Sequence, residues 1–218
     1  MAGKAKAKRR YDSPRRREQA AATRRQILDA AQKLFERQGY AATSMAAIAA
    51  EAGVALKTLY VVFETKSGLL RALWHLVLRG DEADIPVGER PWYREVLEEP
   101  DPARQLRLNV RNTTLVRARI SSLLEVIRSA SAQEADIEAL WNRIQTEFYE
   151  NQRTVLASID AKKALRPGLD ADRAADVLWT LNHPNLYRLL VVDRGWTPEE
   201  YEEWLAGLLC RELLGTQA

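Results

Sequence analysis

The side chains that most often carry catalytic chemistry are few in this sequence. Two histidines, His75 and His183, and a single cysteine, Cys210, stand far apart and do not form a spaced set of metal ligands. The chain has no glycine-rich phosphate-binding loop, and no nucleophile has a candidate base beside it. We therefore expect no enzymatic activity, no metal and no cofactor.

Hydroxyl and ammonium groups suited to phosphate oxygens gather instead in the first third of the chain. Thr58 and Tyr60 can donate at the edge of a DNA groove without demanding a particular base. Lys66 opens a predicted helix, whose N-terminal end favours an anion. Other candidates could reach base edges, guanine for a long donor and thymine methyls for apolar side chains, but they are equally well explained as surface residues. The predicted DNA contacts are Ser44, Leu56, Lys57, Thr58, Tyr60, Val61 and Lys66.

The charge is divided unevenly along the chain. Residues 1–80 contain 16 Lys and Arg against 6 Asp and Glu, whereas the remainder contains 17 against 24. A basic first part joined to an acidic second part predicts a polyanionic partner at one end only. The lone cysteine, the absence of an apolar leader and the absence of a long apolar run predict a cytoplasmic protein that does not enter a membrane.

Two short helices joined by a tight turn are predicted to position the candidate contacts. The segment IAAEAGVALKTLYVVF, Ile48–Phe63, has the spacing of a helix-turn-helix. Ala49 is small where the helices cross, Gly53 can adopt the left-handed conformation that reverses the chain, and Val54 fills the wedge between the helices. The second helix would lie in the major groove of duplex DNA.

Helical periodicity extends over the rest of the chain, and no alternating strand pattern is present, so we predict an all-α fold. Residues 1–17 are expected to be a disordered basic arm that either contacts DNA or is a solvated tail. Residues 18–80 would form the DNA-binding domain with its connecting fourth helix. Residues 81–218 would form a helical domain for ligand binding and dimerisation, which begins with a proline-rich linker at residues 81–104 that contains one short helix.

The last two predicted helices carry clear boundary signals. Residues 170–193 form one helical pattern with Leu178, Leu181, Leu186 and Leu189 inward and a kink expected at Pro184. The final helix begins at Thr197 with Pro198 at its first position and a capping box closed by Glu200. We expect these two helices to form most of a homodimer interface.

The sequence resembles the TetR family of one-component bacterial regulators. The resemblance covers RRQILDAAQKLFERQGYAATSMAAIAAEAGVALKTLYVVFETKSGLL, Arg24–Leu70, where three motif blocks stand in order at family spacing. It implies a homodimeric regulator, usually a repressor, that binds a palindromic operator in duplex DNA and responds to a small effector. By family position, Thr58, Tyr60 and Lys66 match phosphate-contacting residues. Leu56 and Lys57 depart from the usual residues, and so do Ala46 and Ala47, which leaves few side chains to read bases.

That departure keeps a second interpretation open, a sequence-nonspecific architectural DNA-binding protein. In the second half, aromatic side chains with a few polar groups predict an effector pocket, although an aromatic stripe at helical spacing is also typical of plain core. The acidic balance of this half would fit a cationic effector or a solvated acidic surface equally well. The predicted pocket residues are Trp141, Phe148, Tyr149, Trp179, Asn182 and His183.

Overall fold

The structure is a computed structural model that describes residues 14–80 and 85–214. Every regular element within these residues is a helix, and they contain no strand, so the predicted all-α class is confirmed. The chain divides into two compact units, residues 1–70 and residues 71–218. Helix α4, Lys66–Arg79, begins in the first unit and ends in the second. The domain limits predicted at residues 17 and 80 remain predictions.

The first unit consists of α1 (Pro14–Ala42), α2 (Met45–Glu51), α3 (Leu56–Phe63) and the first turn of α4. Helix α1 contains a break at Gly39, whose φ of 80° and ψ of 169° end the helical path where the sequence predicts its end. Apolar side chains of α1, α2 and α3 meet in a core that is closed to solvent. Its fully buried members are Ile27, Ala31, Phe35, Ile48 and Leu59.

Helix α1 begins earlier than the sequence analysis expects. Residues 14–17, assigned there to the disordered arm, are helical. Proline is well placed in a first helical turn because its φ is already near the helical value, and the arginines that follow are good helix formers. The rest of the predicted arm, residues 1–13, lies outside the described residues.

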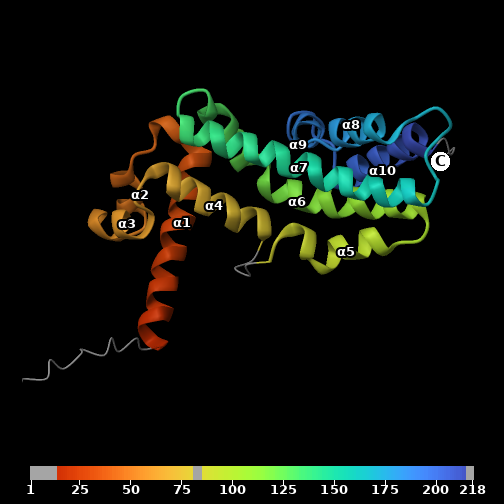
Figure 1. Ribbon diagram of the computed structural model, residues 1–218. Coiled ribbons are helices and arrows are strands. Elements are labelled where there is room, and N and C mark those ends of the chain that lie inside the picture. Colours follow the sequence, from red (N-terminus) through yellow and green to blue (C-terminus); the bar gives the residue numbers. More distant parts are fainter. Residues whose placement is uncertain (1–13, 81–84, 215–218) are drawn as a thin grey trace, which may run out of the picture. The chain divides into compact units, whose positions relative to one another are not determined.

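The second unit is a helical bundle built on two long neighbouring helices, α6 (Pro102–Ser131) and α7 (Ala135–Ala161) (Figure 1). Helices α5 (Pro91–Glu98) and α10 (Pro198–Leu209) pack against α6, and α8 (Ala171–Leu181) packs against α7. The shorter elements are a 3-10 turn at Val87–Glu89, α9 (Pro184–Tyr187), and π-helical turns at Arg188–Val192 and Cys210–Leu214. Leu106, Val110, Leu156, Leu178 and Leu205 are among the core residues.

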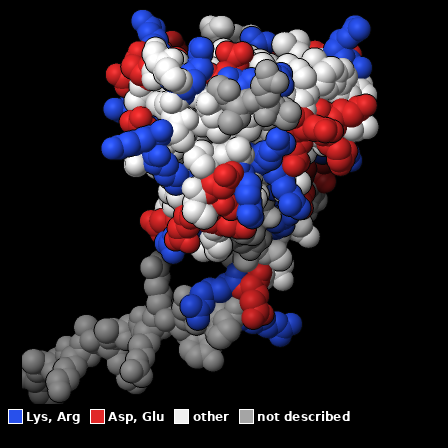
Figure 2. All heavy atoms as spheres, turned by 90° about the vertical axis from the view of Figure 1, so that its right-hand side faces the viewer, with Lys and Arg blue, Asp and Glu red and all other residues white. Residues whose placement is uncertain are grey.

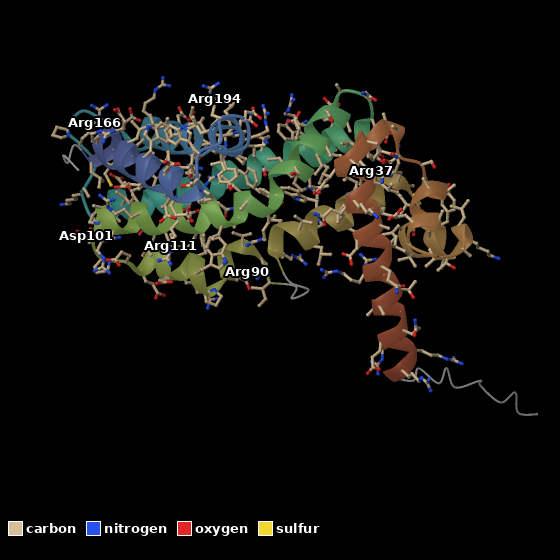
Figure 3. The ribbon with its side chains drawn as sticks, turned by 180° about the vertical axis from the view of Figure 1, so that it is seen from behind. Arg37, Arg90, Asp101, Arg111, Arg166 and Arg194 are labelled. Atoms are coloured by element: carbon tan, nitrogen blue, oxygen red, sulfur yellow. The ribbon has the colours of Figure 1, made fainter. Side chains whose placement is uncertain are left out.

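Side-chain caps fix where these helices start. The Asp101 carboxylate accepts from the Arg104 backbone N–H at 2.7 Å, so α6 begins within the segment predicted as linker, and Asp101 marks that end of the helix in Figure 3. The predicted capping box of α10 is present. Thr197 Oγ1 accepts from the Glu200 N–H at 3.1 Å, and Glu200 Oε2 accepts from the Thr197 N–H at 2.7 Å.

The helical pattern over residues 170–193 is interrupted at Pro184. His183 has extended backbone angles, φ −72° and ψ 139°, because a residue before proline is excluded from the helical region. The prediction that Leu189 points inward is wrong, since its side chain is 48% exposed. It lies in the π-helical turn Arg188–Val192, whose winding differs from the α-helical period on which the inward prediction rested.

Charges of both signs are interspersed over the face of the molecule shown in Figure 2. Among the described residues, no cluster of His, Cys, Asp or Glu has an arrangement that could hold a metal ion. No single helix in the described ranges has the length and hydropathy of a membrane span, and only α2 and α3 taken together, bent by 111°, pass that test.

Candidate functional site

The helix-turn-helix is held by a turn whose backbone requires glycine. Gly53 has φ of 65°, in the left-handed region, while a Cβ at this position would meet nothing within 4 Å. The residue is therefore needed for its backbone conformation and not for close packing. After it, the Val54 N–H donates to the Ala49 carbonyl at 3.0 Å, which ties the turn to the end of α2.

Helix α3 divides its side chains cleanly between core and solvent. Leu59 and Phe63 are buried against the first unit, whereas Tyr60 and Val61 are 47% and 76% exposed. Lys57 and Leu56 are also exposed, and Thr58 is half-buried. The α3 residues named as DNA contacts thus lie on or beside its solvent face, and their contacts to DNA remain a prediction.

Ser44 and Lys66 both have partners within the protein. Ser44 is the N-cap of α2, and its Oγ accepts from the Ala47 N–H at 3.1 Å. Lys66 Nζ donates to the Tyr40 and Thr43 carbonyls at 3.0 and 3.2 Å and lies 3.9 Å from the centre of the Tyr40 ring. A lysine ammonium has three N–H groups, so one remains for a phosphate oxygen. No sequence motif signals this internal role of Lys66.

The second unit contains a cavity of about 390 Å³ that is partly open to solvent. Its wall includes residues from the second half of α4, from α5 and from the junction of α8 and α9, with α6 and α7 forming the longest stretches. The volume is in the range of sites that take a small molecule. The aromatic members of the wall are Trp92, Tyr93, Phe148 and Trp179.

Four of the six predicted pocket residues line this cavity, namely Phe148, Trp179, Asn182 and His183, whereas Trp141 and Tyr149 do not. Trp141 precedes Phe148 by two helical turns, about 10 Å along α7, and so lies past the end of the cavity. Tyr149 is on a different side of α7, where its hydroxyl is 3.3 Å from Asp176 Oδ1 and its ring packs on Trp179.

Side-chain amides form a connected network in the cavity wall. Gln152 Oε1 accepts from Asn109 Nδ2 at 3.0 Å and from Asn182 Nδ2 at 2.9 Å. Thr113 Oγ1 lies 3.3 Å from Asn182 Oδ1. Arg117 donates through Nη2 to the backbone carbonyl of Asn182, at the C-terminal end of α8. The network joins α6, α7 and α8 and holds the polar side of the wall in one arrangement.

His183 has a defined tautomer. Its Nδ1 accepts from the Asn185 backbone N–H at 3.2 Å, so Nε2 carries the proton and donates to Gln145 Oε1 at 2.9 Å. Burial, and secondarily the charge of Arg117, lower the pKa of His183. The imidazole is therefore neutral at pH 7 and offers no positive charge to a ligand.

Sequence reasoning missed the polar stripe on α6 that lines the cavity. Asn109, Thr113 and Arg117 recur at a spacing of four residues, which places them on one face of the helix. The signal was available, because polar residues at a helical interval stand between the apolar positions that mark the core.

The chain is similar to known bacterial regulatory proteins. The family model described as "Bacterial regulatory proteins, tetR family" matches residues 27–73, which include α2 and α3. The HTH-type transcriptional regulator TtgR of Pseudomonas putida is 28% identical over 198 residues, which are 88% of this chain and 91% of TtgR.

Two solved structures share the fold. NalD, the secondary repressor of the MexAB-OprM multidrug efflux pump in Pseudomonas aeruginosa, superposes with a TM-score of 0.68 at 23% identity, covering 89% of this chain and 98% of NalD. The SmeT–triclosan complex gives a TM-score of 0.70 at 21% identity, covering 88% of this chain and 92% of SmeT. With its helix-turn-helix, its helical second unit and these relatives, the chain belongs to the TetR family of helix-turn-helix transcriptional regulators.

Proposed function

We propose that the protein is an effector-responsive repressor that binds a palindromic operator as a homodimer and leaves it when a small molecule enters the cavity of the second unit. The relatives support this proposal, since NalD is described as a repressor and SmeT was solved with triclosan. The contacts expected with DNA come from the exposed face of α3.

The observation that carries the proposal is the path of α4. Its first turn caps the helix-turn-helix unit through Lys66, and its later residues His75, Leu78 and Arg79 line the cavity. A ligand that packs against the later turns would therefore act on the same helix that holds the DNA-binding unit. If α4 can take two positions, a ligand that favours one of them changes the affinity of the helix-turn-helix unit for DNA, which couples ligand binding to DNA release.

Dimerisation is proposed through α10 and the segment before it. Trp204 and Leu208 of α10 are half-buried within one chain, while Leu189 and Val192 are 48% and 60% exposed. Apolar side chains left accessible on adjacent elements are typical of a subunit interface. A two-fold dimer would place two recognition helices about 34–36 Å apart, or a multiple of that distance, on one DNA face.

Sequencing of genomic fragments captured by the purified protein tests this function. We expect one palindromic consensus, bound far more tightly than random DNA at the same salt concentration. Equal affinity for matched and random DNA would instead favour the architectural alternative, for which the apolar exposed face of α3 gives some support. Addition of a cavity ligand should release the operator.

A further inference from the structure

Arg117 is a buried cation with no carboxylate partner among the described residues. Its side chain is 4% exposed and lines the cavity from the middle of α6. Nη2 donates to the Asn182 carbonyl, but Nε and Nη1 are buried without a hydrogen-bond partner. The titratable groups that interact electrostatically with Arg117 are the phenols of Tyr201 and Tyr187, which are neutral at ordinary pH.

A buried guanidinium in this state is energetically costly. Burial lowers the pKa of Arg117, yet arginine keeps its proton in proteins, so the positive charge stays in the wall of the cavity. An ion removed from water without a counter-ion loses its hydration and gains little in return. The single bond to a backbone carbonyl uses one of five N–H donors.

The other polar groups of the cavity wall point to the same ligand chemistry. Trp179 also lines the cavity, and its Nε1 is buried and has no acceptor. In contrast, the amide acceptors Gln152 Oε1 and Asn182 Oδ1 already receive hydrogen bonds from within the wall. The unsatisfied groups in the cavity wall are thus N–H donors, and a ligand that completes them must bring acceptor oxygens.

Two carboxylates, Glu147 and Glu150, belong to the cavity lining but do not neutralise Arg117. Both are exposed to solvent, and Glu147 interacts electrostatically with His75 on α4. Neither is among the groups that act on Arg117. A ligand therefore meets acidic groups where the lining is exposed to solvent and the positive charge of Arg117 where the lining is buried. Apolar wall residues such as Trp92, Phe148 and Ile120 would surround the rest of it.

We propose that the cavity binds an amphipathic anion, an apolar molecule with one carboxylate or similar oxyanion, and that Arg117 pairs with the anionic group. This inference rests on the proposed function in taking the cavity as the effector site. It names an anionic class of effector, in place of the cationic effector that the acidic composition of the second half leaves open. The unpartnered Nε and Nη1 atoms of Arg117 can each donate a charge-assisted hydrogen bond to an acceptor oxygen.

Three aromatic probes of nearly equal shape test the proposal by isothermal titration calorimetry on the full chain: 2-naphthoate, 2-naphthamide and 2-naphthylmethylammonium. We expect the full chain to bind naphthoate about 10- to 100-fold more tightly than naphthamide, with the ammonium weakest, because hydrogen bonds to charged groups are the stronger ones. Arg117→Met should remove this preference. The matched control, Arg111→Met, changes an exposed arginine of the same helix that lies outside the cavity (Figure 3) and should leave the preference intact.

Arg117→Lys and Trp179→Phe keep the test decisive if Arg117→Met does not fold. The lysine variant should keep the order of the three probes with weaker naphthoate binding, and Trp179→Phe should lower naphthoate affinity alone. Equal binding of naphthoate and naphthamide to the unmodified chain, or binding of none of the three, overturns the anion proposal.

Release of operator DNA is measured separately. A neutral probe that binds and releases DNA supports the effector function without Arg117, whereas naphthoate that binds without release supports the anion site and contradicts the effector function.

Discussion

Lys66, the first residue of α4, donates a hydrogen bond of 3.0 Å to the Tyr40 carbonyl and lies 3.9 Å from the centre of the same residue's ring. A second donation reaches the Thr43 carbonyl. These carbonyls follow the break of α1 at Gly39, and the Tyr40 carbonyl also accepts from the Thr43 backbone N–H at 3.2 Å. One ammonium therefore joins the end of α1 to the start of α4 before any DNA is present.

Lys66→Met should consequently lower the free energy of unfolding as well as the affinity for DNA. The methionine keeps much of the apolar stem but removes the two hydrogen bonds that the ammonium donates, which we expect to cost about 1–3 kcal/mol because hydrogen bonds from charged groups are the stronger ones. Urea denaturation followed by circular dichroism measures the loss. Lys57→Met is the matched control, because Lys57 is exposed on α3 and its removal should change stability by less than about 0.5 kcal/mol. Equal stability of the two variants would contradict the capping role.

The exposed face of α3 gives a prediction about how DNA is recognised. Tyr60→Phe removes one hydroxyl from a side chain that is 47% exposed and should weaken binding to matched and random DNA by the same factor, since a phosphate contact carries no base information. Lys57→Ala should instead change the preferred sequence, with a cost of about 1–3 kcal/mol at one position of the consensus. Both are measured by fluorescence anisotropy at fixed salt. If Tyr60→Phe altered the preferred DNA sequence, Tyr60 would be a base-reading residue and not a phosphate contact.

The helix-turn-helix could be predicted from the sequence because its constraints are local. Gly53 is required by one backbone angle. The start of α10 could be predicted for the same reason, because its cap is formed by Thr197 and Glu200, three positions apart. The cavity could be predicted only in part, because its lining comes from separate helices. Phe148 of α7 and Trp179 of α8, for example, line the same cavity only because the two helices pack together. Lys66 and Arg117 donate to acceptors that are 23 or more residues away along the chain, and helical periodicity does not predict contacts at such separations.

The neutral state of His183 predicts a dependence of stability on pH. Its pKa in the folded protein is lowered, mainly by burial, so below a pH of about 6.5 the unfolded chain takes up a proton that the folded chain resists. The stability contribution of this residue is therefore complete above that pH and is lost as the pH falls through it. His75 has a pKa lowered by burial as well and adds to the same trend.

His183→Asn isolates the share of His183. Asparagine still offers an acceptor to the Asn185 N–H at the start of α9, but it does not titrate. Urea unfolding at about pH 5 and pH 8 should show a smaller loss of stability in the variant than in the unmodified chain. His75→Gln serves as the comparison and should remove a separate part of the loss. Parallel curves for His183→Asn and the unmodified chain would show that His183 titrates normally when folded.

The proposed subunit interface gives a prediction about assembly. Leu205 and Leu209 of α10 are fully buried within their own chain, and Tyr187 is also buried, with its ring 5.3 Å from that of Tyr201. These side chains are committed to the core and cannot serve a partner. The half-buried Leu208 and Trp204 lie on the remaining side of α10, and the exposed Leu189 and Val192 extend the available apolar surface.

Leu208→Glu should therefore give a monomer with an intact fold. Loss of a central apolar anchor commonly costs 2 kcal/mol or more, about a 30-fold loss of association, and a buried carboxylate adds to it. Sedimentation velocity measures the mass, and anisotropy measures DNA binding. We expect tight binding to a palindromic site to disappear while weak nonspecific binding remains, because one helix-turn-helix unit makes half of the contacts. Ala139→Glu is the control, since it adds the same charge to an exposed position of α7 and should leave the dimer unchanged. A Leu208→Glu protein that still sediments as a dimer and binds its operator normally would place the interface elsewhere on the chain.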